Sequence, residues 1–439
     1  MSKIKDFGER VLFTEEMRRT HTILIPDMLP HHFRMLAAIM NEYGYHVEML
    51  ENRGAGVTEN GLKYVHNDSC YPAQLVIGQF IDALNSGKYD IDHVALMFSQ
   101  TGGGCRASNY ISLLRKALKQ AGYGHIPVIS LNFQGLESNP GFKLTLPMLI
   151  RMMYAILFGD LLMLLVNRCR PYELEAGQSA KLAGEWTESL TKFLVGTKRL
   201  NYKKVKAKLF DIVKAFSDIP CDRSREKIRV GIVGEIYVKY SPLGNNSLED
   251  FLVSEGCEPV MAGFLDFAMF FIYNCIADYK LYHRGAKMYP VWKFAYKVLQ
   301  KKQKDINEAL ESTGIFRASC DFEKTRSLVD GYLGIGMKMG EGWLLTAEML
   351  EHIENGVNNI VCVQPFGCLP NHIAGRGVMN RIKASHPHVN IAAIDYDPST
   401  SPVNQHNRIK LMLSGNEQPQ GEEPSQKATE TAEIETVPV

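Results

Sequence analysis

Two blocks of short apolar runs, alternating with helix patterns, are the feature that most constrains the fold of this chain. The runs lie at 22–26, 46–50, 93–98 and 127–131 in the first block and at 228–238, 258–262, 359–364 and 389–394 in the second. Strands that alternate with helices form mostly parallel sheets. We therefore predict an α/β protein with two Rossmann-like parallel-sheet domains joined by a helical segment.

The predicted helical segment lies between the two blocks and shows no strand pattern. Its helix patterns cover 148–166, 173–194 and 202–216. The stretch 144–166 is the most apolar of the chain, but it contains Arg151 and Asp160. Charges near the centre of a bilayer are costly. We therefore expect a buried or dimer-interface helix there and not a membrane span.

These patterns divide the chain into four predicted parts. Residues 1–143 form an N-terminal α/β domain, 144–225 a helical connector and 226–413 a C-terminal α/β domain. The tail at 414–439 is acidic and rich in Glu, Gln, Pro, Ser and Thr, so we expect it to be disordered.

Composition narrows the classes of function. The 439 residues carry a net charge of +1, so bulk charge does not indicate a nucleic-acid partner. No long apolar run follows the first residues, so we expect no secretory signal and predict a cytoplasmic location. In a reducing compartment, the nine cysteines are better candidates for metal ligands or catalytic groups than for disulfides.

Three of the nine cysteines lie among loop-forming residues. They are Cys70 in the run 66–72, Cys105 in 101–106 and Cys368 in 364–372. We expect each of them where a strand pattern ends and a helix pattern begins, which is where α/β proteins place their chemistry. Three converging thiolates would suit an iron–sulfur cluster with one open iron. Their spacing includes no compact C-x-x-C run, so zinc and ordinary structural cysteines remain open alternatives.

The other six cysteines have a simpler interpretation. Five lie in or beside helix or strand patterns, where a cysteine is usually a small buried hydrophobe. They are Cys169, Cys221, Cys257, Cys275 and Cys362, and Cys320 stays unassigned.

Several other polar motifs are candidates for chemistry. Glu341 lies between two glycines and is either an acid/base group or a residue that orients its loop. The turn 234–237 follows a strand but lacks the dinucleotide fingerprint, so we favour a plain turn over a phosphate site. Asn245 either binds a ligand or caps the helix that begins near Ser247.

Asp395 and Asp397 form the next candidate pair, at the end of the last predicted strand. They could bind a metal, but a turn before Pro398 is the simpler role. Arg408 is a possible partner for Asp395. His372 follows Cys368 by four residues, but no nearby acid orients it, so a Cys/His hydrolase is disfavoured.

Several of these segments resemble the 2-hydroxyacyl-CoA dehydratase superfamily, and in particular its branch of activase-related proteins. The matching segments are 67–72, 234–240, 340–343, 364–372 and 395–397, and the resemblance runs from about Thr20 to Leu413. The segment around Cys368 is its most specific part.

The resemblance implies a [4Fe–4S] cluster held by Cys70, Cys105 and Cys368, with the fourth iron position open. Related double-cubane cluster proteins join two such clusters across a dimer, so a dimer is expected. The family receives a low-potential electron from a separate ATPase activator with its own iron–sulfur cluster. This chain has no P-loop pattern, so its activator would be another polypeptide.

The function implied by the resemblance is reduction of an acyl-CoA or another small molecule in anaerobic metabolism, with Glu341 as the local acid/base group. The chain would then be a dehydratase-like lyase or a component of an ATP-coupled reductase. The alternatives are a non-catalytic electron-transfer or cluster-carrier subunit and a zinc-stabilised structural protein. Neither a nucleic acid nor a membrane is expected as a partner.

Overall fold

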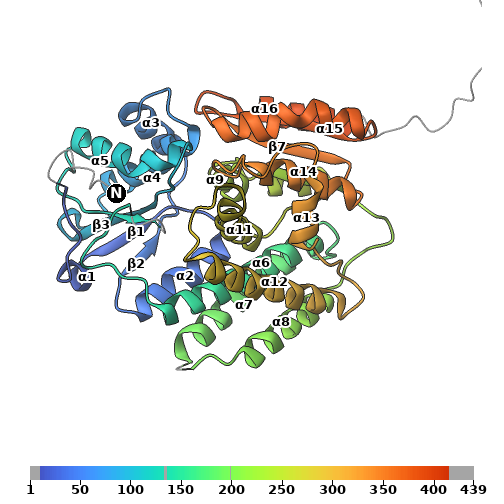
Figure 1. Ribbon diagram of the computed structural model, residues 1–439, viewed down its shortest axis with the longest axis horizontal. Coiled ribbons are helices and arrows are strands. Elements are labelled where there is room, and N and C mark those ends of the chain that lie inside the picture. The colour runs from blue at the N-terminus through green and yellow to red at the C-terminus, as the bar shows by residue number, and fades with distance from the viewer. Residues whose placement is uncertain (1–9, 133–135, 198, 415–439) are drawn as a thin grey trace, which may run out of the picture.

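The computed structural model describes residues 10–132, 136–197 and 199–414 and contains two four-stranded sheets (Figure 1). Every pair of neighbouring strands is parallel. The first sheet has the order β2-β1-β3-β4 and the second β6-β5-β7-β8. The strands are β1 (Thr22–Ile25), β2 (Val47–Met49), β3 (Val94–Ser99), β4 (Val128–Leu131), β5 (Ile228–Gly234), β6 (Cys257–Val260), β7 (Asn359–Pro365) and β8 (Asn390–Tyr396). The predicted α/β fold with two Rossmann-like parallel sheets is confirmed.

The two sheets share one topology. In each, the first strand along the chain pairs with the second on one side and with the third on the other. The direction of winding therefore reverses between β1 and β3 and again between β5 and β7. In open α/β sheets, ligands bind in the crevice outside the carboxyl ends of the strands at such a reversal.

The described helices of the first half include two that the sequence did not predict. The expected helices are α2 (Pro30–Glu42), α4 (Tyr71–Asn85) and α5 (Tyr110–Ala121). The additional ones are the short α1 (Met17–Thr20) and α3 (Ala55–Tyr64). Helix α3 packs closely on α4 through glycines: a Cβ at Gly61 would lie 2.4 Å from the backbone oxygen of Gln74. The prediction that Cys70 follows a strand is therefore wrong, because α3 precedes its loop.

The connector consists of the three expected helices, α6 (Leu146–Cys169), α7 (Gln178–Gly196) and α8 (Tyr202–Ser217). Of the described helices, α6 alone is long and apolar enough to cross a membrane, and 56% of its most apolar window is buried inside the protein. Asp160 of α6 bonds His32 Nε2 at 2.8 Å and accepts the backbone N–H groups of Phe264 and Leu265. Helix α6 is thus a core helix that ties α2 to the start of α11 (Phe264–Tyr282).

The second half contains helices on the second sheet and the pair of α11 and α12 (Tyr289–Glu311), which packs on the connector helices. Besides this pair, its helices are α9 (Ile236–Tyr240), α10 (Leu248–Ser254), α13 (Phe322–Leu328), α14 (Trp343–Glu354), α15 (Met379–Ser385) and α16 (Pro402–Ser414). The predicted strand 228–238 is too long, because its last residues form α9, where Glu235 Oε2 accepts the N–H of Val238 at 2.9 Å. The predicted disordered tail lies, after Ser414, outside the described residues.

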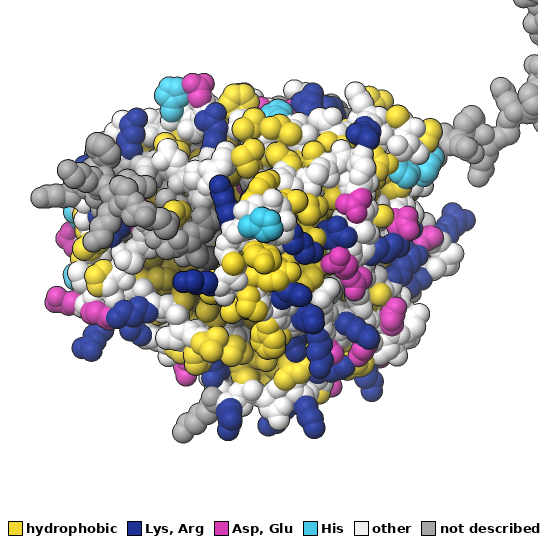
Figure 2. Space-filling model, in the orientation of Figure 1, with side chains coloured by type: hydrophobic (Ala, Val, Ile, Leu, Met, Phe, Trp, Pro, Cys, Tyr) yellow, Lys and Arg dark blue, Asp and Glu magenta, His cyan; other side chains and the backbone are white. Residues whose placement is uncertain are grey.

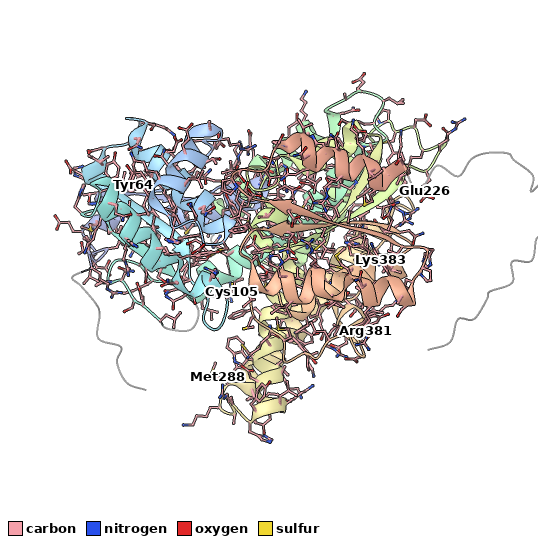
Figure 3. All side chains as sticks on the ribbon, turned by 90° about the horizontal axis from the view of Figure 1, so that it is seen from above. Tyr64, Cys105, Glu226, Met288, Arg381 and Lys383 are labelled. Carbon is pink, nitrogen blue, oxygen red and sulfur yellow. The ribbon has the colours of Figure 1, made fainter. Side chains whose placement is uncertain are left out.

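Helices α11 and α12 form a hairpin that projects from the body, with Met288 at its tip (Figure 3). Several large apolar side chains near this tip are exposed, among them Tyr282 and Phe294. On the face shown in Figure 2, hydrophobic side chains gather near the middle and lie among Lys and Arg.

Candidate functional site

Two of the three predicted cysteines occupy equivalent positions in the two sheets. Cys105 lies after β3 and leads into the short helix η2 (Arg106–Asn109), and Cys368 lies after β7 and leads into the turn η3 (Asn371–Gly375). Strands β3 and β7 are each the third strand of their sheet along the chain. Both loops therefore lie at the winding reversal, where a ligand crevice is expected. Figure 3 shows Cys105 where the N-terminal half borders the C-terminal half.

The loop of Cys70 packs directly on the loop of Cys368. Cys70 is the N-cap residue of α4, and the next N–H, that of Tyr71, donates to the Phe366 oxygen at 2.9 Å. Gly367 has φ +70°, and a Cβ there would lie only 3.1 Å from the Cα of Cys70. The glycine before Cys368 therefore allows the two loops to meet.

The loop of Cys105 joins this contact through the segment that carries Glu341. A Cβ on Gly340 would lie 3.7 Å from Cys105 Sγ and 2.9 Å from Pro370 Cγ, two residues after Cys368. A Cβ on Gly104 would lie 2.1 Å from Met339 Sδ. The structure thus brings all three predicted cysteines and the Glu341 segment to one place, which we call the cysteine junction.

The three thiols of the junction are shielded from water. Cys70 and Cys368 are 4% and 6% exposed, and Cys105 is partly buried. Burial raises the pKa of all three thiols, that of Cys105 to about 12, and the nearby carboxyl groups of Glu341 and Glu235 add to the shift at Cys105 and Cys368. Thiols with raised pKa values stay protonated at pH 7, and a bound metal ion would favour the thiolate.

Two buried carboxyl groups face the junction. Glu341 Oε1 accepts the N–H of Ile236 at 3.0 Å, so Glu341 also orients its loop. Burial and the nearby Glu341 raise the pKa of Glu235 to about 8, and burial raises the pKa of Glu341. Glu235 is an ionisable group of the site that the sequence did not predict. The available signal was a carboxylate directly after a strand end in the turn 234–237.

The turn 234–237 has the plain structural role that we favoured. At Gly234 a Cβ would lie 2.4 Å from the backbone oxygen of Val363, so the glycine permits β5 and β7 to approach.

Several polar atoms at the strand ends are buried without a hydrogen-bond partner among the described residues. Asp27 Oδ1 lies after β1, Thr101 Oγ1 after β3, Tyr237 OH after β5 and Gln364 Oε1 near the end of β7. These are the central strands of the two sheets, at the same ends as the cysteine loops. Buried polar atoms are normally satisfied, so this group offers unfilled hydrogen bonds to a ligand.

The remaining candidates have structural roles. Asn245 Oδ1 accepts the N–H of Leu248 at 3.1 Å, as the capping interpretation predicted. Asp395 pairs with Arg376 at 3.1 Å and Arg408 at 3.2 Å. Asp397 accepts the N–H of Ser399 at 2.7 Å, which favours the turn over a metal site.

The histidine and the other cysteines do not join the junction thiols as ligands. His372 has an exposed side chain, and its backbone N–H donates to the Cys368 oxygen at 3.1 Å. Cys169, Cys257 and Cys362 are buried, and Cys221, Cys275 and Cys320 are partly buried. Across residues 10–132, 136–197 and 199–414, no three His, Cys, Asp or Glu side chains are grouped as ligands of a single ion.

No protein-family model and no curated protein matches this sequence. The function is therefore inferred from the motifs and from the geometry of the cysteine junction.

Proposed function

We propose that this chain is an iron–sulfur protein of the 2-hydroxyacyl-CoA dehydratase type. Cys70, Cys105 and Cys368 would hold a [4Fe–4S] cluster, and a separate ATPase activator would supply a low-potential electron. The chain would then reduce an acyl-CoA or another small molecule in the cytoplasm, as a dimer that could pair two clusters. The observation that carries the proposal is the packing of three cysteine loops that are distant in the sequence, two of which lie at the winding reversals of the two sheets.

The residues of the junction fit such a group chemically. Two buried thiols and one partly buried thiol lie beside two carboxyl groups and have raised pKa values. Iron would supply the positive charge that makes thiolates stable there. Glycines at 104, 340 and 367 remove side chains where the loops meet. When bound, the cluster supplies one-electron chemistry at low potential.

The hydroxyl of Tyr110 supports one of the thiols. It lies 2.9 Å from Cys70 Sγ. A thiolate ligand only accepts hydrogen bonds, so Tyr110 would donate to it. Hydrogen bonds to a ligand sulfur are among the features that tune a cluster's potential.

Glu341 and Glu235 would hold protons beside the reacting molecule. The pKa of Glu235, about 8, favours its neutral acid at pH 7, and a neutral acid donates a proton to a substrate oxygen. Burial also raises the pKa of Glu341 above its ordinary value. The unpartnered Thr101 Oγ1 and Gln364 Oε1 would orient the polar groups of that substrate.

The alternative is a non-catalytic electron-transfer or cluster-carrier subunit. A cavity of about 390 Å³ lies at the far end of α14, and none of the three junction cysteines lines it. The loops of the junction themselves pack closely, which favours passage of an electron over binding of a large substrate in this arrangement.

Electron paramagnetic resonance distinguishes these functions. We expect anaerobically purified protein, reduced with dithionite, to show a cluster signal that changes when acyl-CoA is added. A cluster signal that acyl-CoA leaves unchanged favours the electron-transfer or carrier subunit. A colourless protein with about one zinc and no iron contradicts the proposal.

A further inference from the structure

Helix α14 is buried on all sides and yet carries ionisable residues. Every residue from Trp343 to Ile353 is buried, including Glu348, Glu351 and His352. Glu341, just before the helix, and Glu348 and Glu351 follow the seven- and three-residue spacing of one helix face. Carboxylates are rarely buried without a partner, so this acidic face requires an explanation.

The end of the face nearest the cysteine junction contains a buried ion pair and a small cavity. Lys239 Nζ of α9 lies 2.8 and 2.9 Å from the two carboxylate oxygens of Glu348, and these side chains are 3% and 5% exposed. Glu341, Glu348 and Lys239 line a cavity of about 10 Å³, which is roughly the space for a single water. The cavity joins the ion pair to the carboxyl group at the junction.

The other end of the face reaches the cavity of about 390 Å³. Asp266, Glu351 and His352 line this cavity together with four arginines, Arg168, Arg223, Arg229 and Arg317. His352 is 3% exposed, and its Nε2 atom has no partner among the described residues. Burial lowers the pKa of His352 to about 3, so this imidazole is neutral.

Burial makes the carboxyl groups at this end harder to ionise. Burial raises the pKa of Glu351 to about 7. Burial and the nearby Glu351 raise the pKa of Asp266. Glu351 accepts the Thr325 hydroxyl at 2.9 Å, and Asp266 accepts the Gln303 amide at 2.7 Å.

The groups that face Glu351 come from several elements. They are Glu348 on α14, Lys239 on α9, Asp266 on α11, Lys324 and Thr325 on α13, and Cys320. Asp160 of α6 faces Asp266. An ion pair with a structural role alone would need one carboxylate beside Lys239. Four carboxyl groups lie near Lys239, those of Glu341, Glu348, Glu351 and Asp266.

We propose that the acidic face of α14 is a proton path from the 390 Å³ cavity to the cysteine junction. A proton enters at Asp266 and Glu351, passes the Glu348–Lys239 pair and reaches Glu341 through the water-sized cavity. Only O–H and N–H bonds break and form along the way. The inference rests on the proposed function, because the proton accompanies the electron that the activator supplies. One proton for each electron leaves the net charge of the junction unchanged.

The first test uses the loaded protein. We expect its midpoint potential to fall by close to 59 mV for each pH unit around pH 7, the value for one proton per electron. The route is tested by the rate of proton-coupled reduction in a stopped-flow experiment. Glu348→Gln and Glu351→Gln are expected to slow this rate, and Glu351→Asp is expected to keep most of it. Glu354→Gln, on the same helix but half-exposed, is the control and should keep the wild-type rate. A flat wild-type slope, or a reduction rate that both Gln variants retain, overturns the proton path.

The second test uses iron-free protein, so it separates the proton path from the proposed function. The infrared band of a buried carboxylic acid should be present at pH 5, titrate near pH 7 and shift in D₂O. Thr325→Val removes a hydrogen bond that lowers the pKa of Glu351, so the titration should move to higher pH. This variant also serves if Glu351→Gln fails to fold. No exchangeable acid band contradicts the path even if the cluster is present, and a protein without a cluster contradicts only the proposed function.

Discussion

Replacement of Lys239 by Met tests the energetics of the buried ion pair with Glu348. Both side chains are almost completely buried, and the two N–O distances are 2.8 and 2.9 Å. Removal of one partner leaves an uncompensated buried charge, which typically costs about 3–5 kcal/mol. One kcal/mol lowers the melting temperature of a domain of this size by roughly 2–4 °C, so we expect Lys239→Met to melt roughly 6–20 °C lower.

The assay is thermal unfolding of the iron-free protein, followed by circular dichroism and tryptophan fluorescence. The double variant Lys239→Met/Glu348→Met should recover most of the loss, because it leaves no unpaired charge. Arg34→Met is the control: its pair with Glu51 is exposed, and its loss should cost less than about 1 kcal/mol. If Lys239→Met melts no lower than Arg34→Met, or if the two Met substitutions are additive, the account of this pair is refuted.

Two further predictions concern the loops of the cysteine junction. Gly367→Ala should lower the free energy of unfolding, measured with urea, by more than Gly87→Ala does. Both glycines have φ near +70°, but only at Gly367 would the new Cβ also press against Cys70. Equal losses in the two variants would contradict the loop contact. The raised pKa of Glu235, about 8 against an ordinary value of 4.5, means that the folded state holds this proton more tightly than the unfolded state. The stability of the iron-free protein should therefore fall as pH rises from about 4.5 to 8. In melting curves recorded across this pH range, Glu235→Gln should show a weaker fall. An equal fall in this variant would show that Glu235 does not cause the pH dependence.

The sheets could be predicted from the sequence because their strands are buried on both faces. Runs such as 93–98 and 359–364 are almost continuously apolar, as parallel strands require. Helix α3 could not be predicted in this way, because glycines at 56 and 61 interrupt its apolar pattern. Those glycines reflect close packing on α4, which depends on tertiary structure.

The start of α9 shows a second limit of local patterns. Ile236 and Val238 continue the apolar run of β5 and have high strand propensity. The structure places them in a helix because Glu235 caps it and Gly234 ends the strand against β7.

The sequence could predict which cysteines belong to the candidate site, but not how their loops lie relative to one another. Loop-forming neighbours separated Cys70, Cys105 and Cys368 from the other cysteines. Their meeting depends on the packing of two sheets, which no local pattern encodes. The acidic face of α14 was missed for a related reason: the helix pattern was recognised from its apolar residues, and the partners of Glu348 and Glu351 come from α9, α11 and α13.

The most direct test of the central claim is the iron and sulfide content of anaerobically purified protein. We predict equal amounts of iron and acid-labile sulfide, about four of each per chain, in the wild type. Alanine in place of Cys70, Cys105 or Cys368 should lower both, whereas Cys257→Ala, a buried cysteine outside the junction, should lower neither. Absence of iron from the wild type, or full iron in all three junction variants, would contradict the assignment of the cysteine junction as a cluster site.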